Sequence, residues 1–180
     1  MLQRLLEKIL PPICDSKTPE DKDSADLVPC QQIVERRGQR CDECWELLIN
    51  NKDPFIRMLV ATDPDVAPIA ARRLATDKDP MVLRAMADQS HLHEEASLIL
   101  AESADIATLE ALATKTAYPR VQARLSERDT PLTVMKRLLA NTALANDTLR
   151  SLQEHRDPLI AEEARARSQV ISDMPIIAGA

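Results

Sequence analysis

Residues 53–62 read DPFIRMLVAT, and residues 79–88 read DPMVLRAMAD, so the same pattern returns after 26 positions. Each stretch begins with Asp-Pro, continues with apolar residues at helical spacing and has Ala at its ninth position. Asp accepts hydrogen bonds from the first amides of a helix, and Pro at the first helical position lacks an amide that would be unpaired anyway. Each stretch therefore predicts the start of a short helix, as do Asp157-Pro158 and, with one inserted residue, Asp129-Thr130-Pro131.

A second short helix is expected in each unit, as in residues 67–76 (APIAARRLAT) and 94–103 (EEASLILAES). It ends at a leucine that precedes the next Asp by four or five residues, which we call the marker Leu. The marker leucines are Leu48, Leu74, Leu100, Leu125 and Leu152, and the alanines that keep the same interval, the marker Ala positions, are Ala61, Ala87, Ala113 and Ala140. Helices this short are marginal alone, whereas stacked copies bury a continuous core. The repeat therefore predicts an all-α solenoid of about five short repeats.

Composition excludes several other fold classes. The chain has 180 residues, only two glycines and only 2% aromatic residues. Dinucleotide-binding loops, phosphate-binding loops and nucleophile elbows all need clustered glycines, and the two glycines here are Gly38 and Gly179. β-rich folds need aromatic and β-branched strands joined by glycine turns. The composition thus favours helices and offers no catalytic motif.

The charge pattern favours a cytoplasmic protein that binds neither membranes nor nucleic acids. The formal net charge is -6, and no apolar run approaches the roughly 20 residues of a membrane span. The first ten residues, MLQRLLEKIL, predict a short amphipathic helix rather than a secretory signal. Equivalent positions of successive repeats carry no continuous basic stripe, which argues against nucleic-acid binding.

All four cysteines lie in the first 44 residues, at Cys14, Cys30, Cys41 and Cys44. Clustered cysteines in an intracellular chain indicate a metal site rather than disulfides. Cys41-x2-Cys44 forms a compact pair of ligands if the turn between them opens a helix that continues through Trp45. Neither ferredoxin spacing nor the two paired motifs of a four-cysteine zinc site is present. Spacing alone therefore leaves an iron–sulfur cluster and a structural zinc ion equally open.

Residues around the cysteines have further expected roles. Arg36, Arg37 and Arg40 precede Cys41 and offset negative charge at a thiolate-bound cluster, unless they are simply solvated. Trp45 either shields the metal from water or anchors the core beneath the repeats. The three histidines, His91, His93 and His155, are expected at the surface and not at the metal.

Tandem units of the form DPxVxxxxA…RLA, preceded by a small cysteine cluster, resemble the leucine-rich repeat variant proteins. The repeat resemblance covers residues 49–168, and the cysteine resemblance covers residues 14–44. It implies a right-handed superhelix of alternating α and 3₁₀ helices. It also implies an N-terminal domain with a 4Fe–4S cluster held by Cys14, Cys30, Cys41 and Cys44. Members of this family occur in nitrogen-fixing bacteria, some of them encoded beside nitrogen-fixation genes.

These observations predict three parts: an iron–sulfur domain over residues 1–48, helical repeats over 49–168 and a tail over 169–180. The first functional hypothesis is a module that binds a protein partner on the repeats, with a structural or redox-responsive cluster. The alternative is an electron-transfer protein that uses the cluster, with nitrogen fixation as a context. An enzyme of another class is not indicated by any motif.

Overall fold

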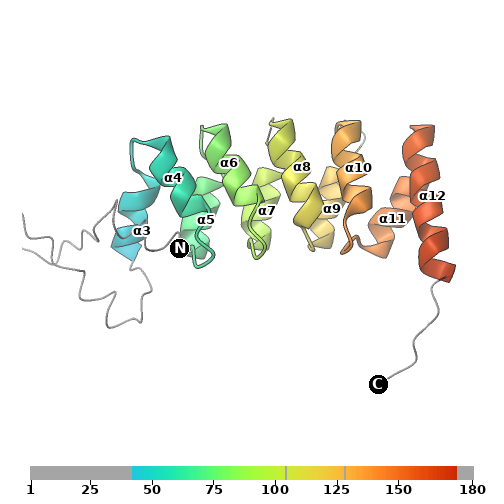
Figure 1. Cartoon of the computed structure of the whole chain (residues 1–180), viewed down its shortest axis with the longest axis horizontal. Helices are drawn as coiled ribbons and strands as arrows, with labels where there is room; N and C mark the ends of the chain where they lie inside the picture. Colours follow the sequence, from blue (N-terminus) through green and yellow to red (C-terminus); the bar gives the residue numbers. More distant parts are fainter. Residues whose placement is uncertain (1–41, 104, 128, 174–180) are drawn as a thin grey trace, which may run out of the picture. The chain divides into compact units, whose positions relative to one another are not determined.

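The computed structural model of the chain describes residues 42–103, 105–127 and 129–173. These residues form helices joined by short connections, without a strand among them, so the described part of the chain is all-α (Figure 1). None of the described helices is both long enough and apolar enough to cross a membrane. The chain divides into two compact units, Met1–His93 and Glu94–Ala180, which we describe one at a time.

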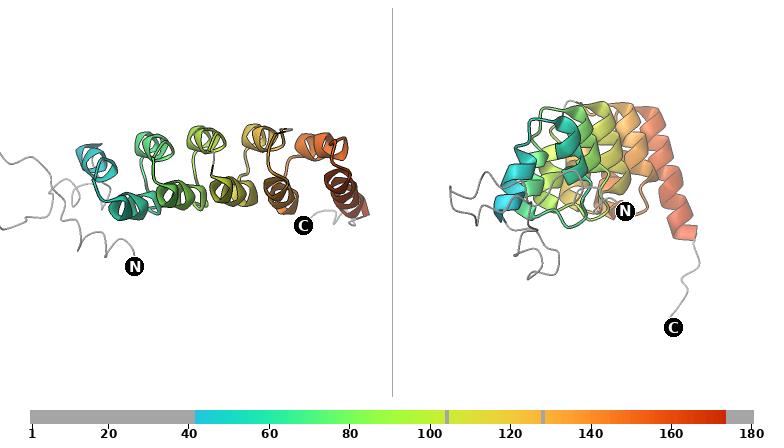
Figure 2. Two further views of the ribbon diagram at one scale, coloured as in Figure 1. Left: turned by 90° about the horizontal axis from the view of Figure 1, so that it is seen from above. Right: turned by 60° about the vertical axis from the view of Figure 1, so that its left-hand side comes forward.

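The described part of the first unit contains α3 (Asp42–Ile49), α4 (Pro54–Ala61), α5 (Pro68–Leu74) and α6 (Pro80–Ala87). Helix α4 packs against α6, and α3 packs against both α4 and α5. The second unit contains α7 (Glu94–Leu100), α8 (Ile106–Lys115), α9 (Pro119–Leu125), α10 (Leu132–Ala140), α11 (Asn146–Gln153) and α12 (Pro158–Asp173). Within this second unit, α8, α10 and α12 form one row and α7, α9 and α11 form another (Figure 2). A first and a second helix thus alternate along the chain, as the repeat predicts.

The Asp-Pro motifs start helices for the expected reason. Asp53 and Asp79 cap α4 and α6, and each accepts a hydrogen bond at 2.9 Å from the amide two residues later. Asp105 caps α8 without a following proline, through a 2.9 Å bond from the Thr108 amide. Asp129 is the exception, because α10 begins at Leu132 with Pro131 at its N-cap and no side-chain cap. The prediction that Asp129 starts a helix is therefore wrong, since the inserted Thr130 moves the helix start beyond its reach.

The marker leucines are all buried, with exposed fractions between 0 and 7%. The alanines at 61, 87 and 113 are buried as well, at 0, 1 and 0%. Ala140 is exposed, and Leu139 occupies the core in its place at 4%. The core keeps the 26-residue interval of the other repeats, because Leu139 and not Ala140 stands 26 residues after Ala113.

Both helices of each described repeat are α-helices. The amides of Arg57 and Leu83 bond to the carbonyls of Asp53 and Asp79, four residues earlier, as an α-helix requires. The alternation of α and 3₁₀ helices implied by the resemblance is therefore not found in the described residues. Short connections, rather than tighter helices, fit two helices into each 26-residue unit.

Two helices, α3 and α12, extend across the expected domain limits. Helix α3 crosses residues 48 and 49, and the division between the two compact units falls at 93 and 94, within the predicted repeats. Helix α12 continues to Asp173, beyond the expected start of the tail at 169.

Candidate functional site

The four predicted metal ligands fall largely outside the described residues. Cys14, Cys30 and Cys41 precede the described part, and Cys44 lies in α3 with only its backbone described. Among the side chains that the structure does describe, no three His, Cys, Asp or Glu come together in a way that could hold a metal ion. Of the predicted four-cysteine site, the described residues contain only the helix that follows Cys41 and includes Cys44.

Helix α3 starts at Asp42, directly after Cys41, and includes Cys44 in its first turn. The prediction that the Cys-x2-Cys segment opens a helix is thus confirmed. The first amides of a helix have no partner within it and carry the positive end of the helix dipole. Thiolates placed at such an end gain hydrogen-bond donors and a favourable field. This local arrangement suits a thiolate-ligated metal, whether an iron–sulfur cluster or zinc.

Helix α3 is anchored to the repeats through its apolar face. Trp45, Leu48 and Ile49 are buried, at 5, 7 and 7% exposure, and α3 packs on α4 and α5. On its exposed face, Glu46 accepts hydrogen bonds at 2.6 and 2.8 Å from Nη1 of Arg73 in α5. Trp45 therefore belongs to the core of the first unit. The helix that bears Cys44 serves as the second helix of the first repeat, so the cysteine pair is attached directly to the repeat array.

A second feature links successive repeats and was missed by the sequence reasoning. Asn141 is 4% exposed, and its Nδ2 donates to the carbonyls of Ala113 and Thr116 at 2.9 and 2.8 Å. Gln89 in the first unit donates to the carbonyls of Ala61 and Asp63 in the same way. Arg167 donates to the carbonyls of Leu139 and Asn141. We call Gln89, Asn141 and Arg167 the inter-repeat donors, because each reaches back 25 to 28 residues to the preceding first helix.

The inter-repeat donors are structural rather than catalytic. Their amide or guanidinium groups satisfy carbonyls at the C-terminal ends of helices, which have no intrahelical partner. Burial lowers the pKa of Arg167, because desolvation disfavours its charged form. Their shared property is donor capacity and not residue type, so a search for identical residues does not find them. Each stands ten residues after the N-cap of its first helix, at Asp79, Pro131 and Asp157, but the cap at Pro131 is known only from the structure.

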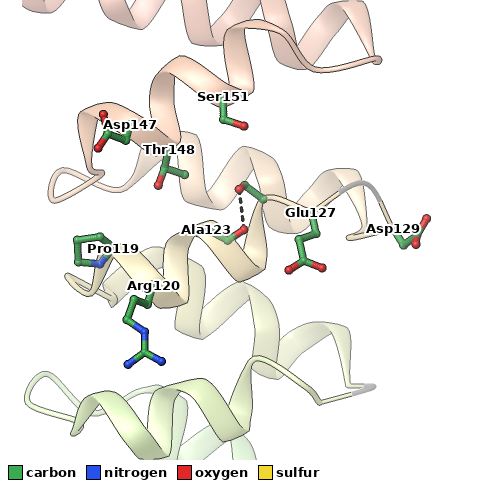
Figure 3. A pocket seen from close by; sticks show the side chains of 9 residues that line it. Pro119, Arg120, Ala123, Glu127, Asp129, Asp147, Thr148 and Ser151 are labelled. Carbon is green, nitrogen blue, oxygen red and sulfur yellow. Dashed lines mark hydrogen bonds between the residues drawn. The ribbon is translucent and has the colours of Figure 1, made fainter.

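An open groove of about 750 Å³ lies between α9 and α11 in the second unit (Figure 3). Its lining residues are Pro119, Arg120, Ala123, Ser126, Glu127, Asp129, Asp147, Thr148 and Ser151. The charged groups do not converge on one point: Arg120 lies 3.7 Å from Glu94, and Asp147 pairs with Arg150 of the same helix at 3.1 Å. The groove is a polar surface depression, and its described side chains form no nucleophile–base pair.

The histidines lie apart from α3. His91 and His93 are exposed, as predicted. His155 is half-buried: its Nδ1 accepts a 3.1 Å hydrogen bond from the Asp157 amide, and its Nε2 is buried without a hydrogen-bond partner. His155 is therefore at the surface only in part, because its Nδ1 accepts the hydrogen bond of the turn into α12.

Comparison of the chain with protein-family models, with curated proteins and with solved structures gives no match.

Proposed function

We propose that this protein is an intracellular protein-interaction module of helical repeats whose N-terminal segment binds a 4Fe–4S cluster through Cys14, Cys30, Cys41 and Cys44. The single observation that carries the proposal is that α3 begins directly after Cys41, includes Cys44 and packs its apolar residues into the repeat core. Four thiolates are a donor set that suits such a cluster. The sequence resemblance, and not the fold, favours iron–sulfur over zinc.

In this proposal the repeats continue as a right-handed solenoid with a surface for a protein partner, in the cytoplasm. Two facts support it: first helices contact first helices within each unit, and the three inter-repeat donors link α6 to α4, α10 to α8 and α12 to α10. Solenoids offer extended surfaces to partners because each repeat contacts only its neighbours. The groove has a polar lining, and its described side chains form no nucleophile–base pair, so it gives no support to an enzymatic role.

The role of the chain's own residues at the cluster follows from α3. Cys41 and Cys44 would hold one side of the group, with the free amides of the first turn directed at the sulfur atoms. When bound, the cluster supplies either a folding constraint for the N-terminal segment or one-electron redox chemistry. Because α3 packs on α4 and α5, loss of the group is expected to loosen the N-terminal segment and leave the remaining repeats helical.

A Cys41→Ser variant tests this assignment, with Cys44→Ser beside it. We expect both variants to lose the bound iron and to become sensitive to proteolysis near the N-terminus, while the helical circular dichroism signal changes little. A matched control is Ser90→Ala, an exposed residue of the first unit away from α3. Retention of the full iron content by both cysteine variants would contradict the ligand set.

Electron transfer remains the second candidate, favoured by Arg36, Arg37 and Arg40 before Cys41, which would offset the cluster's negative charge and raise its potential. Reversible reduction by dithionite with retention of the fold would support it. If the bound cluster cannot be reduced and reoxidised without unfolding of the protein, electron transfer is excluded and only the structural role is left.

A further inference from the structure

Five of the eight large apolar side chains that are exposed in the described residues lie at the start of a first helix. They are Phe55, Met81, Ile106, Leu132 and Leu159, with exposed fractions from 43 to 62%. Each is the first or second residue of a first helix. Single exposed apolar residues are ordinary on any protein surface. Recurrence at the first or second residue of five successive first helices is not, and it points to a shared use.

The second unit contains three of these residues, Ile106, Leu132 and Leu159, which we call the apolar row. They stand at the starts of α8, α10 and α12, whose N-terminal ends lie along one edge of this unit, the upper edge in Figure 1. Helix α10 packs against both α8 and α12. Packed helices lie about 8–10 Å apart, so the apolar row presents a side chain at about that interval.

Carboxylates surround the apolar row. The connection that precedes each of the three helices carries two of them, and the six are Glu102, Asp105, Glu127, Asp129, Glu154 and Asp157. The cations that the described residues place at this edge are fewer, namely Arg124 and Arg156. Arg124 is shared between Glu102 and Glu127, and its hydrogen bonds lower the pKa of Glu102. The edge is therefore negative at neutral pH, which disfavours nucleic acids and acidic membranes as ligands.

We propose that the apolar row binds an extended segment of a partner protein in which an apolar residue recurs at every third position, with Lys or Arg between. A polyproline II segment advances about 3.1 Å per residue with three residues per turn, so the same face returns after about 9 Å. That interval matches the spacing of neighbouring helices. Basic residues between the apolar ones complement the six carboxylates.

This inference rests on the proposed function only in that both require a protein partner. The assay below needs neither metal nor redox chemistry, so its failure would leave the iron determination untouched. Conversely, a protein that binds zinc or no metal could still bind the peptide.

The probe is a fluorescein-labelled peptide of four Leu-Pro-Lys triplets, titrated with the full chain and followed by fluorescence anisotropy. We expect saturable binding that weakens as salt is added, because exposed charges are screened. A peptide of Leu-Pro-Glu triplets should bind at least about tenfold more weakly, since it meets the carboxylates with like charge. Replacing Ile106, Leu132 and Leu159 together by Ser should also weaken binding at least about tenfold.

Helix α12 provides a matched control for the apolar contacts. Leu159→Ser lies in the apolar row and Val170→Ser lies outside it, on residues that are 62 and 63% exposed. We expect Leu159→Ser to weaken binding severalfold and Val170→Ser to leave it unchanged. If the triple variant does not fold, the pair Glu127→Lys and Asp129→Lys gives a second test, since both residues are exposed and neither caps a helix. These two substitutions together should weaken binding of the lysine peptide and strengthen binding of the glutamate peptide.

Four outcomes would overturn the proposal. The first is the absence of saturable binding. The second is a loss of peptide binding in Val170→Ser equal to the loss in Leu159→Ser. The third is tighter binding of an amphipathic helical peptide with the same Leu and Lys content. The fourth is self-association of the wild-type chain that the triple variant abolishes, because the row would then join two copies of this chain.

Discussion

Arg57 in α4 donates two hydrogen bonds to Asp77, which follows α5. Nε donates to Oδ2 at 2.6 Å, and Nη2 donates to Oδ1 at 2.9 Å. The same guanidinium donates from Nη1 to the carbonyl of Asn51 at 2.8 Å. Asp77 in turn accepts a bond from the amide of Asp79, which caps α6. One bidentate pair therefore ties together the connections that begin two successive repeats.

Replacing Asp77 by Asn should lower the free energy of unfolding of the first unit by about 2 kcal/mol at pH 7, because charge-assisted hydrogen bonds contribute about that much. Both side chains are largely buried, at 17% exposure for Arg57 and 9% for Asp77. Denaturation followed by the fluorescence of Trp45, the only tryptophan, measures this unit. Asp65→Asn is the control in the same unit, because Asp65 is exposed, and should change little.

The effect of Asp77 should also depend on pH. Burial favours the protonated acid, but the hydrogen bonds from Arg57 and from the Asp79 amide outweigh it and lower the pKa of Asp77. A carboxyl whose pKa is lowered by folding stabilises the native state above its unfolded pKa of about 3.9, and this stabilisation is lost as pH falls through the folded pKa. The difference between wild type and Asp77→Asn should be constant from about pH 5 to 7 and shrink below about pH 4. A constant difference down to about pH 2 would contradict the ion pair.

Asn141→Ala should destabilise the second unit by about 3 kcal/mol, because it leaves the buried carbonyls of Ala113 and Thr116 without their donor. Urea denaturation followed by circular dichroism measures the change. Asn146→Ala, at an exposed position of α11, should stay within about 0.5 kcal/mol of wild type. Equal effects of the two variants would show that the inter-repeat donors do not stabilise the stack.

Asp79→Ala should lower the free energy of unfolding by about 1 kcal/mol, the usual effect of removing a helix N-cap. Asp129→Ala should have almost no effect, although sequence alone places both residues before a helix. The structure explains the difference, because α10 starts after Pro131 and makes no use of the Asp129 carboxylate as a cap. If Asp129→Ala lowered the free energy of unfolding as much as Asp79→Ala does, the start of α10 would have to lie two residues earlier.

Local patterns made much of the fold predictable. Asp-Pro starts and marker leucines are signals within one helix, and they located nearly every described helix. The same reasoning failed at Asp129, which Thr130 separates from Pro131. It also failed at Ala140, which lies one position past the buried Leu139, because a one-residue shift turns a buried position outward on a helix. Longer-range features share a property and not a residue type: the inter-repeat donors are Gln, Asn and Arg, and the apolar row is Ile and Leu.

The candidate site was predictable only at its last pair. Cys41 and Cys44 are close in sequence, so their place at the start of α3 follows from local helix chemistry. Cys14 and Cys30 are separated from Cys41 and Cys44 by long stretches with no periodic pattern. In the proposed site they would reach that pair through tertiary contacts, which spacing does not encode. The anchoring of α3 by Trp45 was one of two open alternatives, and burial against α4 and α5 places Trp45 in the core.

The most direct test of the central claim is the metal and sulfide content of the full chain purified without oxygen. We predict iron and acid-labile sulfide in equal amounts, about four of each per chain, with a broad absorption near about 400 nm that bleaches on reduction. The Cys41→Ser protein, purified in the same way, should contain neither. A colourless wild-type protein with one zinc ion per chain, or with no metal, would contradict the claim.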